Sequence, residues 1–296
     1  MDSREDFLTL LTEELHHLDD HQLQTQDIKV AFFDIDGTLL GLDGQYSEAS
    51  KHQIQRLKAH GIKVAVASGR PNFAAQFIID ELSISDPGVF CTGAHVYCPT
   101  TQDTLVMQGV SPALSRRLTD VLRNSDIYYE LYTANDYFIE SDIGEEIGRT
   151  HATHMRQTPQ RRSFDELIGV DPVVKFLVAV NHEREHEKLY ALERSFPECQ
   201  FAYARIAAHP DWLFASVIDN DACKHQAFDF LLDYYGVSAE NVISFGDAQS
   251  DKVFLERAGT GVAMGQAVDD VKLVANYITR PVWDDGVAYA ISRLIK

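Results

Sequence analysis

The sequence predicts an α/β protein whose parallel sheet is interrupted by a second, α+β unit. The first observation is a pair of apolar runs, Val30–Phe33 and residues 62–67, which lack polar alternation and suit strands covered on both faces. A helical pattern at residues 48–60 separates them and ends at Gly61, a residue type favoured just past a helix end. The second observation is that residues 98–219 follow the order α-β-β-α-β-α-β-β, which predicts an antiparallel sheet with helices on one face.

The length of 296 residues is comfortable for two domains of ordinary size. We expect a core domain made of residues 28–97 and 220–296, with the second unit, residues 98–219, inserted between them as a cap domain. Residues 1–27 carry apolar side chains at helical spacing, so we expect an N-terminal helical extension there. This extension is a candidate for self-association.

Composition and charge limit the partners of this chain. Hydrophobic residues make up 45% of it and charged residues 24%, which is typical of a soluble globular protein. A net charge of −19 argues against nucleic acid and anionic membranes as partners, because both attract basic surfaces. A small phosphorylated molecule is still possible, since a cation, a lysine and backbone N–H groups can form a local positive pocket.

The cysteines and the apolar runs indicate the compartment. The four cysteines show no CxxC spacing and are expected to be free thiols, as in a reducing cytoplasm. The chain has no run of about 18 apolar residues, and its first residues are acidic. We therefore expect a cytoplasmic protein without a membrane span or a secretory signal.

Two aspartates follow the first predicted strand. Asp34 and Asp36 are separated by one residue, so their side chains leave an extended backbone on the same side. The carboxyl ends of strands are where open α/β sheets bind ligands. Two carboxylates this close repel each other unless a cation lies between them, and Mg²⁺ prefers oxygen ligands. The pair predicts a magnesium site, although an acidic turn that only ends a buried strand has the same residue types.

The sequence DIDGTL, which begins at Asp34, resembles the first motif of the haloacid dehalogenase (HAD) superfamily, most of whose members are magnesium-dependent phosphatases. The resemblance implies a Rossmann-like core with a parallel sheet, and the insertion at residues 98–219 resembles the cap of subclass IIB. It also implies that Asp34 is the nucleophile and that Asp36 is the general acid and base. Mg²⁺ would bind the Asp34 carboxylate and the backbone carbonyl of Asp36.

The second predicted strand ends in Ser68, Gly69 and Arg70, and the sequence ASGR resembles the second motif of Cof-type HAD proteins. In that motif the serine hydroxyl and nearby N–H groups bind a phosphoryl oxygen, and glycine lets the backbone approach. A serine at a strand end is also a common helix N-cap, and both roles are compatible here. Arg70 is expected to lie near the substrate or to orient the closing cap.

Two later stretches resemble the remaining motifs. Lys224 matches the third-motif lysine, whose point charge contacts the phosphoryl group, although an isolated lysine is more often solvated. Asp247 matches a magnesium ligand of the fourth motif. Asp251 is expected to bind the metal, to hold a metal-bound water or to orient Lys224. Ser250 stands where relatives commonly have asparagine, and we include it with Ser68, Gly69 and Lys224 as a phosphate-binding candidate.

The resemblance implies a magnesium-dependent phosphatase that hydrolyses a small phosphate monoester, such as a sugar phosphate, through an aspartyl-phosphate. A phosphomutase or phosphotransferase would share these motifs, and a non-catalytic binding protein is a further alternative. Dehalogenation is disfavoured because the dehalogenases of the superfamily lack the second aspartate, which is Asp36 here.

The substrate is not evident from the sequence. Its contacts would come from the cap, but the sequence does not distinguish among the candidates Tyr132, Tyr137, Arg149, Arg156 and His209. His151 and His154 lie three residues apart but lack a third ligand, so they do not predict a metal site.

Overall fold

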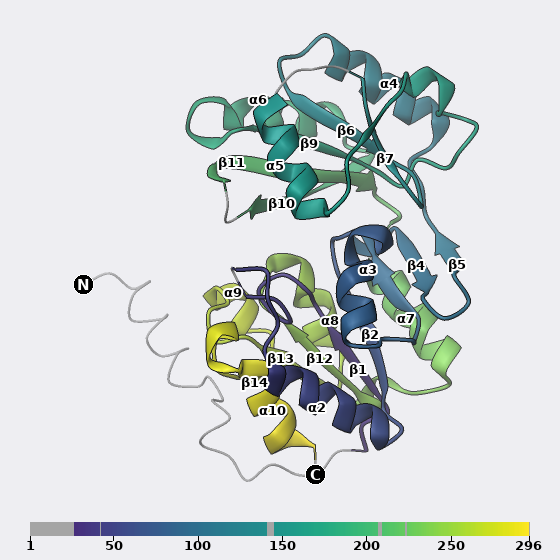
Figure 1. The fold of residues 1–296 in the computed structure, drawn as a ribbon. Helices are drawn as coiled ribbons and strands as arrows, with labels where there is room; N and C mark the ends of the chain where they lie inside the picture. Colours follow the sequence, from purple (N-terminus) through teal and green to yellow (C-terminus); the bar gives the residue numbers. More distant parts are fainter. Residues whose placement is uncertain (1–26, 42, 141–144, 207–208, 223, 296) are drawn as a thin grey trace.

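The computed structural model describes residues 27–295, except residues 42, 141–144, 207–208 and 223 (Figure 1). Only Asp27 of the predicted N-terminal extension falls within this range. The helix and the self-association expected for residues 1–27 therefore lie outside the described residues.

The core is built on a five-stranded parallel sheet with the order β14-β13-β12-β1-β2. Its strands are Val30–Phe33 (β1), Lys63–Val66 (β2), Val242–Gly246 (β12), Thr260–Ala263 (β13) and Tyr277–Ile278 (β14). β1 lies between β2 and β12, so the core segment before the cap and the core segment after it pair in the middle of the sheet. The carboxyl ends of β1 and β12 consequently lie side by side.

Helices cover both faces of this sheet. They are Glu48–Ala59 (α2), Asn72–Glu81 (α3), Lys224–Tyr235 (α7), Lys252–Arg257 (α8), Asp269–Lys272 (α9) and Gly286–Leu294 (α10). Phe33 stacks on Phe245 with ring centroids 4.8 Å apart, in the apolar cluster that α2, α3 and α10 cover. Phe32 meets Phe254 edge-on at 5.1 Å in the cluster that α7 and α8 cover. These contacts confirm the prediction that β1 is buried on both sides.

A small antiparallel sheet lies beside the core sheet. It contains Gly88–Phe90 (β3), His95–Cys98 (β4) and Asp103–Met107 (β5), and a bridge between Ala67 and Val89 joins it to the end of β2. The domain boundary that we expect at residues 97 and 98 falls within β4. That boundary stays a prediction.

The cap is a six-stranded sheet with the order β10-β11-β9-β6-β7-β8 and its helices (Figure 1). The strands are Tyr128–Tyr132 (β6), Tyr137–Ile139 (β7), Gln160–Arg161 (β8), Lys175–Asn181 (β9), Cys199–Ile206 (β10) and His209–Asp219 (β11). Neighbouring strands are antiparallel except β7 and β8, which are parallel. The prediction of a fully antiparallel sheet is therefore wrong for this one short pair of strands.

The prediction that the cap helices share one face is also wrong. Helices α4 (Pro112–Arg123) and α6 (His182–Ser195) cover one face, where Leu118 and Leu189 pack on Leu131. Helix α5 (Glu145–Met155) covers the opposite face, where Ile147 packs in a cluster with Tyr132. That cluster also contains residues of α3, so this face of the cap meets the core. β6 reads YYELY, and every residue of it is buried, Glu130 included, so polarity does not mark a solvent-facing side of this strand.

Short 3-10 turns complete the structure at Cys91–Gly93, Phe164–Glu166, Ala239–Asn241, Gln249–Asp251 and Val282–Asp284. Cys91, Cys98 and Cys199 are buried free thiols, as expected, and Cys223 lies outside the described residues. Within the part of the chain that the structure describes, none of the helices combines the length and the apolar character needed to cross a membrane.

The fold predicts a pH dependence of stability at His95. This side chain is buried in β4, and its Nε2 lies 2.9 Å from Thr104 Oγ1. Burial lowers the pKa of His95 to about 4, whereas a histidine in an unfolded chain has a pKa of about 6.5. As the pH falls, the unfolded chain therefore takes up the proton first. The free energy of unfolding is unaffected by His95 above about pH 6.5 and decreases as the pH falls from there toward 4.

The free energy of unfolding of the wild type should fall between pH 7 and pH 5. We expect this fall to be about 2 kcal/mol smaller in His95→Gln. Urea unfolding at the two pH values measures the difference, and comparison within each protein cancels any constant effect of the substitution. An equal pH-dependent loss in both proteins would show that His95 is not the group responsible.

Candidate active site

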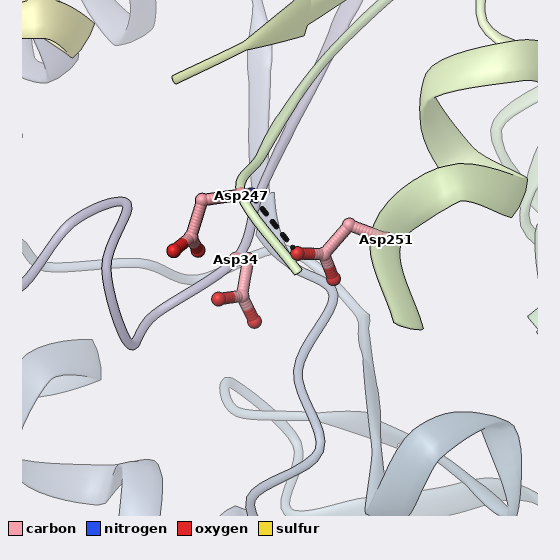
Figure 2. Close-up of side chains that lie close together, drawn as sticks. All are labelled: Asp34, Asp247 and Asp251. Atoms are coloured by element: carbon pink, nitrogen blue, oxygen red, sulfur yellow. Dashed lines mark hydrogen bonds between the residues drawn. The ribbon is translucent and has the colours of Figure 1, made fainter. Parts of the chain in front are cut away.

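Three carboxylates meet at the carboxyl ends of β1 and β12. Asp34 follows β1, Asp247 follows β12 and Asp251 ends the 3-10 turn before α8. A carboxylate oxygen from each lies within 4.8 Å of one from each of the others. Figure 2 shows the three side chains around one small region, with Asp34 and Asp251 buried. The pairing of β1 with β12, two strands far apart in the sequence, thus brings together the aspartates of the first and fourth motifs.

Crowding perturbs these carboxylates. Burial, followed by the charge of Asp251, raises the pKa of Asp34 well above its usual range, while Lys224 acts in the opposite direction. Burial and the Asp251 charge also raise the pKa of Asp247 to about 7. A hard divalent cation binds carboxylate oxygens and would offset this repulsion, so the residues present fit the metal that the sequence implies.

Neighbouring loops hold Asp247 in place. Thr38 Oγ1 donates to Asp247 Oδ1 at 3.3 Å, and Gln266 Nε2 lies 3.4 Å from Asp247 Oδ2. Gln266 Nε2 also donates to the carbonyl of Gly37 at 2.5 Å. Gly37 has a φ of +83°, and a Cβ there would overlap the Asp247 carboxylate, so this turn requires glycine. The support from Thr38 and Gln266 was not predicted, because it depends on loops that only the fold brings together.

Lys224 and Asp251 form a buried ion pair, with Nζ and Oδ1 2.9 Å apart. Lys224 is only 4% exposed, so the alternative of a solvated surface lysine is wrong. The other oxygen of Asp251 accepts from the N–H groups of Asp247 at 3.1 Å and Ala248 at 2.9 Å. Of the three roles considered for Asp251, orientation of Lys224 is visible in the geometry. Its place in the carboxylate cluster is also compatible with metal binding.

The remaining phosphate-binding candidates lie on the surrounding loops. Ser68 is buried, and its Oγ accepts from the N–H of Arg70 at 3.3 Å. Helix α3 begins at Asn72 without a side-chain cap, so the expected N-cap role of Ser68 is wrong. Gly69 has no positive φ, and space for a Cβ exists beside it. Ser250 Oγ donates to Asp251 Oδ1 at 3.3 Å. Phosphate binding by Ser68, Gly69 and Ser250 stays a prediction.

The side chain of Asp36 points to Arg70 and is not part of the three-carboxylate cluster. Arg70 holds it with two hydrogen bonds, from Nε to Oδ2 at 2.7 Å and from Nη2 to Oδ1 at 2.8 Å. Burial alone would raise the pKa of Asp36, but the hydrogen bonds and charge of Arg70 outweigh it and lower the pKa. The predicted contact of Asp36 with a metal ion therefore concerns its backbone carbonyl.

Arg70 also connects the core to the cap. Its Nη1 donates to the carbonyl of His154 on α5 at 2.9 Å, and its Nη2 lies 3.4 Å from His154 Nδ1. Burial, and then the positive charge of Arg70, lowers the pKa of His154 to about 4. Of the two roles expected for Arg70, contact with the cap is the one that the geometry favours.

The cap residues considered as substrate contacts divide into two groups. Tyr132 and Tyr137 stack on Phe73 of α3, and the Arg156 guanidinium lies 3.6 Å from the ring centroid of Phe77 on α3. These three residues therefore lie where the cap meets the core. Arg149 is on α5, and the side chain of His209 lies outside what the structure describes.

The histidines of α5 have other partners than a metal site. His151 Nδ1 lies 3.0 Å from the carboxylate of Glu130, and His154 contacts Arg70. Neither histidine belongs to the cluster of Asp34, Asp247 and Asp251. The expectation that they are not metal ligands stays a prediction.

A family model of haloacid dehalogenase-like hydrolases matches residues 31–291. The chain belongs to this family. It is 29% identical over 272 residues to the 5-amino-6-(5-phospho-D-ribitylamino)uracil phosphatase YitU of Bacillus subtilis, covering 90% of this chain and 97% of the relative. It is 24% identical over 267 residues to the pyridoxal phosphate phosphatase YbhA of Escherichia coli, covering 89% and 97%. A solved sugar phosphatase of HAD subclass IIB has the same fold, with a TM-score of 0.76, 22% identity and coverage of 89% and 98%.

These comparisons confirm the predicted α/β fold with its inserted cap and the resemblance to the HAD superfamily. The chain is an enzyme of the HAD phosphatase type that acts on phosphorylated substrates. A non-catalytic binding protein is thereby disfavoured. Hydrolases of the HAD family typically use a divalent metal ion, and the cluster of Asp34, Asp247 and Asp251 provides a group of acidic residues suited to one.

The crowded cluster predicts that a divalent cation stabilises the protein. At a Mg²⁺ concentration a hundredfold above its dissociation constant, binding contributes about 2.7 kcal/mol, which raises the unfolding temperature by roughly 5 °C. We expect Asp247→Asn to remove most of this shift, because it removes one ligand charge. Without metal, the variant should unfold at or above the wild-type temperature, because one of three close negative charges is gone.

Thermal unfolding with EDTA and with Mg²⁺ measures both effects. The matched control is Asp270→Asn, which removes an exposed aspartate on α9 and should leave the shift unchanged. A full Mg²⁺ shift in Asp247→Asn would show that the cation binds elsewhere.

Proposed function

We propose that this protein is a magnesium-dependent phosphatase that hydrolyses a small phosphate monoester, such as a sugar phosphate or a related metabolite, through an aspartyl-phosphate. The observation that supports it most is the cluster of Asp34, Asp247 and Asp251 beside the buried ammonium of Lys224. The relatives YitU and YbhA are named for small phosphate monoesters, which supports the same class of substrate. The free thiols of Cys91, Cys98 and Cys199 favour a cytoplasmic location.

The carboxylates of Asp34, Asp247 and Asp251 would hold the cation together with the backbone carbonyl of Asp36. When bound there, Mg²⁺ would neutralise the crowded carboxylates and stabilise negative charge on the phosphoryl oxygens. The ionised form of Asp34 is the one that can attack phosphorus. The nearby ammonium of Lys224 favours this form by lowering the pKa of Asp34 against the effect of burial.

Asp34 attacks phosphorus in line with the leaving oxygen and forms an aspartyl-phosphate, which divides one difficult displacement into two easier steps. The Lys224 ammonium and the Ser68 hydroxyl bind the transferring phosphoryl oxygens. Asp251 holds Lys224 at 2.9 Å, so the charge is oriented before substrate arrives. Water then hydrolyses the aspartyl-phosphate and releases inorganic phosphate.

Asp36 donates a proton to the leaving oxygen in the first step and accepts one from water in the second. Arg70 orients the Asp36 carboxylate and favours its ionised form, which suits the second step. Protonation of Asp36 for the first step requires that this ion pair weaken. Since Arg70 also bonds the cap at His154, we infer that cap movement and the protonation of Asp36 are linked.

The nucleophile is tested by Asp34→Asn. We expect this variant to keep its fold and to lose essentially all release of inorganic phosphate, because an amide cannot form the acyl-phosphate. Phosphate release from an aryl phosphate and circular dichroism give the two measurements. Near-normal Mg²⁺-dependent activity would contradict the assignment, and transfer of the phosphoryl group to a sugar hydroxyl would instead favour a phosphotransferase.

The acid and base is tested by Asp36→Asn with two substrates. An alkyl phosphate needs a proton on its leaving oxygen, whereas an aryl phosphate with an acidic phenol does not. We expect kcat to fall about 10²–10⁴-fold on the alkyl phosphate. With the aryl phosphate, a rapid burst of phenol should precede slow turnover, because only hydrolysis of the aspartyl-phosphate is impaired. Equal losses on both substrates without a burst would show that Asp36 has another role.

A further inference from the structure

A second buried lysine lies in the cap, outside the machinery described above. Lys175 is the first residue of β9 and is 4% exposed. Its Nζ lies 3.1 Å from Ser216 Oγ on the neighbouring strand and 3.4 Å from the carbonyl of Gly69 in the core. It also lies 4.7 Å from the centroid of the Tyr132 ring. Among the described residues, none of the acidic side chains forms an ion pair with it.

This arrangement leaves the charge of Lys175 poorly compensated. Burial lowers the pKa of Lys175, while the Cys91 thiol and the Glu130 carboxylate act in the opposite direction and favour the ammonium form. Glu130 is itself fully buried. Its oxygens are already occupied, because they accept from the hydroxyls of Tyr128 and Tyr132 and lie 3.0 Å from His151 Nδ1. An ammonium held by neutral acceptors loses its hydration without gaining an ion pair, which is unfavourable in a protein interior.

The position of Lys175 is at the boundary between cap and phosphate loop. Gly69, whose carbonyl it contacts, directly follows Ser68. Arg70 bonds the carbonyl of His154 on α5, and Lys175 lies against the ring of Tyr132 in the cap, so both cations lie where the cap meets the core. Arg70 is neutralised by Asp36, whereas Lys175 has no such partner. The uncompensated charge therefore lies on the side of the site where the leaving group would meet the cap.

We propose that Lys175 binds an acidic group on the leaving group, so that the preferred substrates are phosphate monoesters whose alcohol carries a carboxylate or a second phosphate. This proposal rests on the proposed phosphatase function and narrows its substrate class. A neutral hydroxyl would not compensate the buried charge, whereas an anion would form a charge-assisted hydrogen bond worth roughly 1.5–3 kcal/mol in similar settings, which corresponds to about ten- to hundredfold in affinity.

A purely structural role for Lys175 predicts different behaviour. If the lysine only joins the cap to the core, its replacement should lower stability and reduce activity on all substrates in the same proportion. If its charge is retained for the substrate, Lys175→Met keeps the apolar stem and removes an uncompensated charge. The unfolding temperature of that variant should then be equal to or above that of the wild type.

The test compares glycerol phosphate with phosphoglycerate and glycerol bisphosphate, which replace a neutral group by a carboxylate or a second phosphate. We expect the wild type to favour at least one acidic substrate over glycerol phosphate by about tenfold or more in kcat/KM. Lys175→Met should reduce that ratio about tenfold or more, mainly through KM. The two acidic substrates show which anion is preferred. Lys188→Met, on α6, is the control and should leave the ratio unchanged.

Two outcomes would overturn the proposal. One is a wild type that shows no preference for either acidic substrate, and the other is a Lys175→Met variant that keeps the wild-type ratio or unfolds at a lower temperature with equal losses throughout. Aryl phosphate hydrolysis that depends on Asp34 would remain in either case, so these failures are distinct from a failure of the phosphatase function itself.

Discussion

The active site is organised around three carboxylates that the fold holds close together, against their mutual repulsion, beyond the ends of two adjacent parallel strands. Asp34 and Asp247 follow β1 and β12, whose register pairs Phe33 with Phe245, so the sheet itself fixes their proximity. Aromatic contacts on both faces of β1 hold that register. One carboxylate of the cluster, Asp251, is paired with Lys224, and the remaining negative charge suits the site to a divalent cation.

The cap contributes through a small number of polar contacts set in an aromatic layer. Tyr132 and Tyr137 stack on Phe73 of the core. Within this layer Arg70 joins Asp36 to α5. The residue that we propose as acid and base is thus tied to the cap, whose closure over the site would exclude water. The guanidinium of Arg70 therefore links Asp36 in the core to α5 in the cap.

The sequence predicted the parts of this site that lie within short motifs. Asp34, Asp36, Lys224 and Asp247 were found because each directly follows a strand or begins a helix with a recognisable pattern. The pairing of Asp36 with Arg70 was not predictable, since it depends on side-chain direction after the turn. The position of α5 was misassigned because every residue of β6 is buried, including its one charged residue, Glu130, so the sequence marks no solvent-facing side of this strand. Contacts between distant loops, such as that of Gln266 with Asp247, leave no local signal.

Lys175 and Lys224 illustrate what burial means in two different electrostatic settings. Both ammonium groups are equally buried, yet Lys224 has a carboxylate at 2.9 Å and Lys175 has a hydroxyl and a carbonyl. The charge of Lys224 is balanced before substrate binds, which suits the proposed contact with the constant part of the substrate, the phosphoryl group. Lys175 has no carboxylate among its direct hydrogen-bond partners in the described protein, which makes its environment sensitive to the variable part of the substrate. We therefore assign the chemistry to the core, where Lys224 is paired with a carboxylate, and the choice of substrate to the cap, where Lys175 is not.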